Sequence, residues 1–247
     1  MFKFDIITVF PKIFDSYFNE SIIKRAQALK LVNIKTHDIR AFAENKHKKI
    51  DDRPYGGGAG MVLKIEPIVA AVSSILKSKV SPAKVFQKKN LGGQASQKSK
   101  VRTKVIILSP KGKQFTQKMA YDWSRRYSQL ILISGRYEGI DERAKKILRA
   151  EEVSIGPYVM TDGDVGAMAI VSAVARLIPN VINWDSLQDE SFFRKVIKEE
   201  VETGELEYPH YTRPEIFEYK GKKYRVPKVL LSGDHKKVEE WRKKMRK

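Results

Sequence analysis

The chain has 247 residues, 42% of them hydrophobic, a net charge of +19 and no cysteine. This length and apolar content suffice for a buried core and argue against global disorder. Disulfide bonds, a thiolate nucleophile and Cys-ligated zinc are excluded. No apolar run approaches the roughly 18 residues of a membrane span. The acid at Asp5 interrupts the first apolar stretch, unlike a signal peptide. We therefore expect a cytoplasmic protein without membrane contact.

The positive charge is concentrated in two segments. Residues 77–104 hold nine Lys and Arg and no Asp or Glu, and residues 217–247 hold twelve Lys and Arg against four acids. Because each neutralised phosphate releases counterions, such clusters favour a polyanion such as a nucleic acid. A solvated, solubilising surface is the alternative.

The predicted secondary structure alternates between strands and helices over the first 180 residues. Apolar or alternating runs predict strands, and apolar residues at helical spacing predict helices. Strands are expected at 4–10, 32–39, 105–109, 130–134, 153–155 and 158–160, and helices after Pro11 and at 66–76, 114–127, 141–149 and 165–178. This alternation predicts an α/β domain with a parallel sheet.

The chain divides by composition into a large domain, a linker and a small domain. The large domain is expected at 1–180, with a basic inserted loop at 77–103 that is rich in Lys, Ser, Gln and Gly. A polar linker is expected at 181–207. The last segment, 208–247, contains a predicted helix and too few apolar residues to fold alone.

Three turns rich in Gly and Pro follow successive predicted strands, at 108–112, 134–139 and 155–163. Ligands of open α/β sheets bind outside the carboxyl ends of the strands, and glycine there lets the backbone approach a ligand closely. The turns therefore predict a ligand site. Ordinary connections between strands and helices also favour Gly and Pro, so that alternative stays open.

Familiar nucleotide and nucleophile motifs are absent. The glycine-rich run at 56–60 is not GxGxxG, because Met61 occupies the last position, and the chain has neither a P-loop nor a GxSxG elbow. The segment 207–214 combines aromatic residues with His210 and Arg213, which suits base stacking and phosphate binding. A rigid linker between prolines is the alternative.

Longer motifs carry a family resemblance. In order, the chain reads FDIITVFP, DDRPYGGGAGM, LSP, GRYEGIDER, SIGPYVMTDGDVGAM, ARLIPN, YPHYTRP and VPKVLLSGDH, and then a helix with Trp241. These segments resemble the bacterial tRNA (guanine-N1)-methyltransferase family, TrmD, over nearly the whole chain. The resemblance implies a SPOUT-type parallel sheet with a deep trefoil knot, followed by a small, mainly helical C-terminal domain that grips tRNA. It also implies a homodimer with active sites at the subunit interface, acting on tRNA and not on DNA.

The resemblance further implies a reaction: a methyl group passes from S-adenosylmethionine to N1 of guanosine at tRNA position 37, beside the anticodon. A Mg²⁺ requirement is implied too, although the sequence shows no dedicated metal site. Cofactor-binding positions fall on Leu108, Ser109, Pro110, Gly135, Tyr137, Glu138, Gly139, Ile155, Gly156, Pro157, Tyr158, Val159, Met160 and Gly163. RNA-binding positions fall on Tyr55, Gly57, Gly58, His210, Tyr211 and Arg213.

The implied catalytic residues are Glu190, Asp189 and Arg176. The family uses a linker aspartate as the base, and Glu190 occupies that position here with Asp189 beside it, so either acid is a candidate. Arg176 aligns with an arginine proposed to stabilise developing charge. The loop at 161–166 departs from the family's usual Ser-Gly-Gly-Glu-Leu-Pro. Two alternatives therefore stay open: a related methyltransferase with another RNA target, and a non-catalytic RNA-binding protein.

Overall fold

The computed structural model describes residues 1–77, 102–183, 186–187, 190–192 and 206–246. Contacts divide the chain into two units, Met1–Ile182 and Asn183–Lys247, and each unit is considered by itself. Most of the predicted inserted loop, most of the predicted linker and the candidate base Asp189 lie outside the described residues.

The first unit is built on a five-stranded sheet in which all neighbouring strands run parallel. The strand order is β2-β1-β6-β5-β7. Its strands are β1 (Phe2–Thr8), β2 (Val32–Asp38), β5 (Thr103–Gln114), β6 (Gln129–Ser134) and β7 (Glu151–Ser154). The predicted α/β domain with a parallel sheet is therefore confirmed.

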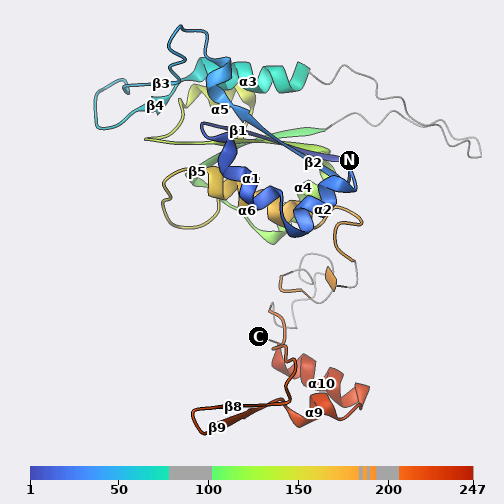
Figure 1. The fold of residues 1–247 in the computed structure, drawn as a ribbon. Helices are drawn as coiled ribbons and strands as arrows, with labels where there is room; N and C mark the ends of the chain where they lie inside the picture. The colour runs from blue at the N-terminus through green and yellow to red at the C-terminus, as the bar shows by residue number, and fades with distance from the viewer. Residues whose placement is uncertain (78–101, 184–185, 188–189, 193–205, 247) are drawn as a thin grey trace, which may run out of the picture. The chain divides into compact units, whose positions relative to one another are not determined.

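Helices cover both faces of this sheet (Figure 1). One layer contains α3 and α5, which pack on each other, and the other contains α1, α2, α4 and α6. The α-helices are α1 (Asp15–Phe18), α2 (Ser21–Ala28), α3 (Ile65–Lys77), α4 (Gln117–Arg126), α5 (Arg143–Leu148) and α6 (Asp164–Ala175). Short 3₁₀ helices are η1 (Pro11–Phe14) and η2 (Ile39–Phe42), and a two-residue ladder joins β3 (Asp51–Asp52) to β4 (Val62–Leu63).

The central strands are buried on both faces, as expected where helices cover a parallel sheet. Every side chain of β6 is buried. Phe4 and Ile6 on β1 and Leu130 and Leu132 on β6 are fully inaccessible to solvent. This explains why these strands read in the sequence as continuous apolar runs.

One line of polar side chains crosses this apolar sheet. Thr103 donates to Gln129 at 3.0 Å, Gln129 donates to Asp5 at 2.6 Å, and His37 pairs with Asp5 at 2.8 Å. These residues come from β5, β6, β1 and β2, so the line links four adjacent strands. Its hydrogen bonds offset the cost of burying Asp5, which is 6% exposed.

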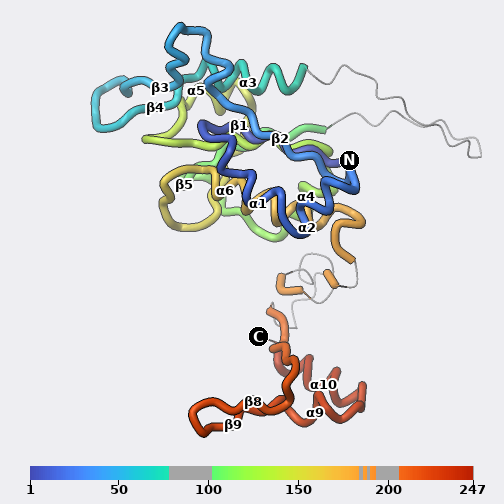
Figure 2. Tube along the Cα trace, in the orientation of Figure 1, coloured from blue at the N-terminus to red at the C-terminus, as the bar shows by residue number. Residues whose placement is uncertain are grey.

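Two of the predicted strands, 105–109 and 158–160, differ from the structure. The strand predicted at 105–109 extends to Gln114, with a register shift against β7 between Leu108 and Lys113, so α4 begins later than predicted. Residues 158–160 form no strand. They lie in the wide loop between β7 and α6 (Figure 2), where Val159 is 83% exposed and has no strand to pair with.

The extended β5 passes β7 so closely that Gly112 has no room for a side chain. A Cβ there would lie 2.4 Å from the Val153 backbone nitrogen. A Gly112→Ala substitution must therefore push the two strands apart, and we expect it to lower the free energy of unfolding by about 1–3 kcal/mol. Urea unfolding checks this, and a midpoint equal to that of the unaltered chain would contradict it.

From residue 206 on, the described part of the second unit forms a hairpin followed by the helices α9 and α10. Its elements are β8 (Ile216–Tyr219), β9 (Lys222–Arg225), α9 (Lys228–Leu231) and α10 (His235–Met245). The helix around Trp241 was predicted, whereas the hairpin was not. Asp234 caps α10 by accepting backbone hydrogen bonds from Lys236 and Lys237.

Within the described residues, no helix is both long enough and apolar enough to span a bilayer.

Candidate functional site

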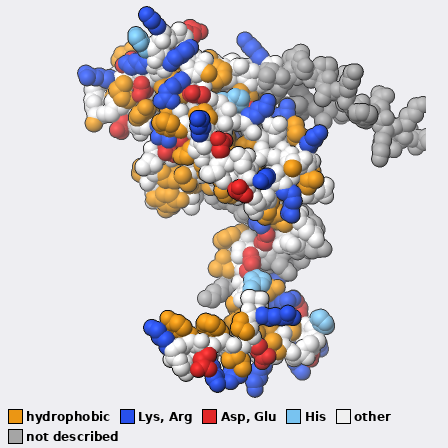
Figure 3. All heavy atoms as spheres, viewed as in Figure 1, with side chains coloured by type: hydrophobic (Ala, Val, Ile, Leu, Met, Phe, Trp, Pro, Cys, Tyr) orange, Lys and Arg blue, Asp and Glu red, His pale blue; other side chains and the backbone are white. Residues whose placement is uncertain are grey.

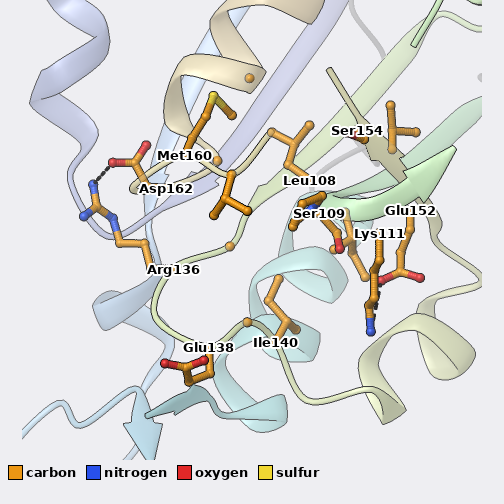
Figure 4. Close-up of a pocket in the computed structure, with 18 of the residues that line it drawn as sticks. Leu108, Ser109, Lys111, Arg136, Glu138, Ile140, Glu152, Ser154, Met160 and Asp162 are labelled. Atoms are coloured by element: carbon orange, nitrogen blue, oxygen red, sulfur yellow. Dashed lines mark hydrogen bonds and ion pairs between the residues drawn. The ribbon is translucent and has the colours of Figure 1, made fainter. Parts of the chain in front are cut away.

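A cavity of about 370 Å³ lies at the carboxyl ends of β5, β6 and β7. Its walls come from three segments: the register-shifted part of β5, the loop after β6 and the loop between β7 and α6. In Figure 4, Leu108 and Ser109 face the space from β5, Glu138 from the loop after β6, and Met160 from the loop before α6. Its volume is in the range of small-molecule sites.

The cavity brings together most of the predicted cofactor positions. Gly156 and Pro157 do not line it: Gly156 is buried in a turn held by Ser154, and Pro157 is exposed. The positions that do line it are Leu108, Ser109, Pro110, Gly135, Tyr137, Glu138, Gly139, Ile155, Tyr158, Val159, Met160 and Gly163.

Backbone contact between two loops forms one end of the cavity. The Gly163 amide donates to the Gly135 carbonyl at 2.9 Å. A Cβ on Gly163 would lie 3.0 Å from the Gly135 nitrogen and 3.1 Å from the Leu108 side chain. A side chain at Gly163 would therefore be tightly packed where these three segments cross.

An ion cluster fixes the loop that precedes α6. Arg136 donates to Asp162 at 3.0 Å and to Asp164 at 2.8 Å, and Thr8 donates to Asp164 at 2.7 Å. The guanidinium also lies 4.3 Å from the centre of the Phe10 ring. Asp164 is completely buried, so this cluster supplies the hydrogen bonds and the opposite charge that its carboxylate needs.

Sequence reasoning did not single out this cluster, although all three charged residues lie in the quoted motifs. The available signal was local: the loop carries two aspartates, 162 and 164. Nothing in the linear sequence pairs them with Arg136, because the contact spans 26 to 28 residues.

The cavity is acidic although the chain is strongly basic. Lys111 donates to Glu142 at 2.9 Å, which raises the pKa of Lys111 and lowers the pKa of Glu142. Lys145 donates to Glu152 at 2.5 Å, which raises the pKa of Lys145. Five carboxylates line the cavity against three cationic side chains: Glu138, Asp141, Glu142, Glu152 and Asp162 against Lys111, Arg136 and Lys145.

Glu138 is the acid of this set that stays available for a ligand. Within the described residues its carboxylate makes no hydrogen bond or ion pair. Its side chain lies against the backbone of Gly60, where a Cβ would come within 2.5 Å of the carboxylate oxygen. We infer that a cationic group in the cavity would meet a free negative charge there.

The glycine-rich loop borders the same cavity wall. Glu138 donates its amide to the Met61 carbonyl at 3.0 Å, and Leu63 donates to Gly139 at 3.0 Å. The predicted RNA-binding residues Tyr55, Gly57 and Gly58 lie on this loop, and Tyr55 is fully exposed. Both glycines have positive φ, which explains why the loop needs them.

Arg176 does not line the cavity. It is the half-buried C-cap of α6, while Gly163 at the cavity precedes the first residue of the helix. At about 1.5 Å per residue, the helix separates the two by roughly 20 Å. The cavity and Arg176 of one chain are therefore at opposite ends of α6.

Glu190 belongs to the second unit, next to a hydrogen-bonded clip. Glu207 accepts from the Ser191 amide at 3.0 Å, and the Ser191 hydroxyl accepts from the Glu207 amide at 3.1 Å. The predicted RNA-binding residue His210 pairs with the other Glu207 oxygen at 3.2 Å. The clip thus ties the segment that carries Glu190 to the segment 207–214.

The other two predicted RNA-binding residues of this segment are exposed. Tyr211 is 49% exposed, with its ring 6.3 Å from that of Trp241 on α10. Arg213 is exposed as well. Tyr208, which is buried, anchors the segment by stacking with Arg242 at 5.0 Å.

The clip should depend on pH. The backbone hydrogen bond from Ser191, helped by His210, lowers the pKa of Glu207 below its ordinary value of 4.5. Its stabilising contribution is therefore complete above pH 4.5 and is lost as the pH falls through the lowered pKa. The Ser191 amide proton should shift in NMR spectra over that range. An amide chemical shift that stays constant until Glu207 is fully protonated would contradict this. So would a change in chemical shift with its midpoint above pH 4.5.

Among the described residues, no group of three or more His, Asp or Glu side chains is arranged to hold a metal ion.

The fold is that of an α/β protein with a parallel sheet, and its cavity lies at the carboxyl ends of the strands, where ligands of such sheets bind. The family described as tRNA (Guanine-1)-methyltransferase TrmD matches residues 2–247. The chain belongs to this family.

Three relatives, each named tRNA (guanine-N(1)-)-methyltransferase, resemble the chain over nearly its whole length. One from Alkaliphilus oremlandii is 46% identical and covers 96% of this chain and 84% of the relative. One from Dictyoglomus turgidum is 45% identical, and the match covers 99% of this chain and 84% of the relative. One from Clostridioides difficile is 42% identical, and the match covers 97% of this chain and 90% of the relative.

Proposed function

We propose that the chain transfers a methyl group from S-adenosylmethionine to N1 of guanosine at tRNA position 37. Membership of the family and the names of its relatives support tRNA guanine-N1 methylation. The observation that carries the proposal is the acidic cavity in a chain of net charge +19, built from the loops that the family resemblance implies.

The residues of the cavity fit S-adenosylmethionine. This molecule carries a sulfonium and an ammonium group, and the excess of carboxylates, with Glu138 free, suits such a cation. The backbone of 108–110, 137–139, Ile155 and 158–160 supplies the amides and carbonyls that would hold the adenine edge. When bound, the cofactor supplies an electrophilic methyl group.

The protein must prepare the acceptor nitrogen, because guanine N1 carries a proton at neutral pH. A carboxylate that removes this proton is required, and Glu190, with Asp189 as the neighbouring alternative, takes that role. Loss of the proton builds negative charge on O6 of the guanine. Arg176 stabilises this charge through its guanidinium.

A homodimer explains how these groups meet. Arg176 is roughly 20 Å along α6 from the cavity of its own chain, so the two act together only if a second copy contributes. Apolar side chains at the end of the sheet, including Phe10, Ile13 and Tyr17, are exposed and available for such an interface.

A trefoil knot is part of the proposal for the first unit. The tight crossing of Leu108, Gly135 and Gly163 at the cavity supports it, since a threaded chain requires close backbone packing there. We also propose that the second unit binds tRNA and that residues 181–207 act as the linker that joins the two domains. We further propose that the protein acts in the cytoplasm.

RNA binding would use both units. Tyr55, Gly57 and Gly58 lie on the loop whose Met61 accepts a hydrogen bond from Glu138 at the cavity, and His210, Tyr211 and Arg213 lie in the second unit with exposed rings and charge. The carboxylates and imidazoles of the described residues form no group that could hold the implied Mg²⁺.

The product nucleoside tests the proposed function. tRNA transcripts incubated with the chain and labelled S-adenosylmethionine should give 1-methylguanosine on complete digestion, identified by mass spectrometry. A different methylated nucleoside would overturn the target and favour a related methyltransferase. No methylated nucleoside, with both substrates bound, would favour a non-catalytic RNA-binding protein.

A further inference from the structure

The hairpin of the second unit has one face made of aromatic rings and a lysine. In the antiparallel pairing, Phe217 is opposite Tyr224 and Tyr219 is opposite Lys222. Directly opposite residues project to the same face of a ladder. We call Phe217, Tyr219, Lys222 and Tyr224 the aromatic face. The other face carries Ile216, Glu218, Lys223 and Arg225.

The rings of the aromatic face are open to solvent. Phe217 is 56% exposed, Tyr219 55% and Tyr224 50%, and all eight residues of the two strands are exposed. The cross-strand pair of Phe217 and Tyr224 helps to hold the hairpin. That role does not require Tyr219, whose opposite neighbour is Lys222. The ring of Tyr219 is therefore exposed on the aromatic face without being part of the aromatic pair that stabilises the hairpin.

Cations surround these rings. The Lys220 ammonium lies 5.4 Å from the centre of the Tyr219 ring, and the Lys222 ammonium lies 5.5 Å from that of Tyr224. Lys223 and Arg225 lie on the other face, where Lys223 pairs at 3.8 Å with Glu218, the single acid within the two strands. Figure 3 shows hydrophobic side chains along the hairpin, with Lys and Arg side chains on its opposite side.

The turn fixes this arrangement in advance. Lys220 and Gly221 both have positive φ, at 51° and 73°, which gives the two-residue turn that matches the twist of a hairpin. The rings are thus held on a short, defined ladder, and a ligand would not have to order a loop in order to use them.

We propose that the aromatic face binds unpaired nucleotides of RNA, with bases stacked on the rings and phosphates near Lys220 and Lys222. Aromatic rings interleaved with cations are the features that recognise single-stranded nucleic acid. A second copy of this chain is a poor occupant, because both hairpins are positively charged. That the RNA is tRNA rests on the proposed function.

Binding of the full chain to three RNAs tests the proposal: an unmodified tRNA transcript, a uridine oligonucleotide and an RNA duplex. Tyr219→Thr keeps a strand-forming residue but removes the ring, and should weaken binding of tRNA and of the oligonucleotide about tenfold, with unchanged salt dependence. Tyr219→Phe should bind as the unaltered chain does. Ile216→Thr, on the other face, is the matched control and should change little.

Lysine and aromatic variants should differ in how they respond to salt. Lys222→Gln should reduce the slope of log affinity against log salt concentration by about one, since it removes one phosphate contact. Duplex binding should be insensitive to Tyr219→Thr, because a duplex offers no free base to stack.

Three results would overturn the proposal. The first is an RNA affinity of Tyr219→Thr equal to that of the Ile216→Thr control, and the second is an equal loss of duplex and oligonucleotide binding in Tyr219→Thr. Alternatively, sedimentation could show self-association that Tyr219→Thr abolishes, which would assign the face to a second copy. The chain could also form no 1-methylguanosine and still need Tyr219 to bind the oligonucleotide. That result would contradict the proposed function and support this inference.

Discussion

A Glu190→Gln chain should lose methyl transfer by about 10²- to 10⁴-fold, the contribution typical of a positioned general base. The amide keeps the size of the side chain but cannot accept the N1 proton. The neighbouring clip should stay intact, because its hydrogen bonds join Ser191 and Glu207. Single-turnover rates with saturating tRNA measure the chemical step, and the affinity for tRNA should stay within a few-fold.

The control is Glu44→Gln, the same chemical change at an exposed acid of the first unit. It should leave the rate unchanged. Asp189→Asn separates the two candidate bases: if Asp189→Asn is the slow variant and Glu190→Gln is fast, the assignment of Glu190 is wrong. Full activity in both variants would remove the linker acids from the mechanism altogether.

An Arg136→Met chain should be less stable by about 3–5 kcal/mol, because it leaves a buried carboxylate without its cation. Asp164 is inaccessible to solvent and would keep only the hydroxyl of Thr8. The loop before α6 also loses one of the hydrogen bonds to Asp162, so binding of S-adenosylmethionine should weaken as well. Denaturant unfolding and calorimetric titration measure the two effects.

Arg143→Gln provides the comparison for this variant. Arg143 forms an ion pair with Asp141 at 2.6 Å, but its side chain is 66% exposed, so water replaces the partner. Its unfolding midpoint should stay close to that of the unaltered chain. A double variant, Arg136→Met with Asp164→Asn, should recover part of the loss. Equal midpoints for Arg136→Met and Arg143→Gln would show that the buried cluster is not a source of stability.

The parallel sheet and the segments around the cavity were predictable because their signals are local. Strands buried on both faces read as apolar runs, as in β6, and turns at strand ends carry Gly and Pro. Gly135 and Gly163 stand in such turns, although only the structure shows that their backbones touch. The likeness of long motifs, and not their periodicity, indicated the chemistry.

Other features depend on contacts between distant segments. The extension of β5 to Gln114 results from pairing with β7, which no local pattern encodes. The segment 158–160 has strand-like residues but no partner strand, so it remains a loop. The partners of Arg136 are 26 and 28 residues away. The roles of Glu190 and Arg176 stay predictions, since Arg176 does not line the cavity and Glu190 belongs to the second unit.

The most direct test compares two tRNA transcripts that differ only at position 37, one with guanosine and one with adenosine. Labelled S-adenosylmethionine supplies the methyl group, and label retained on the RNA is counted. The account predicts transfer to the guanosine transcript and none to the adenosine transcript. Equal labelling of both transcripts, or labelling of neither while both bind, would contradict it.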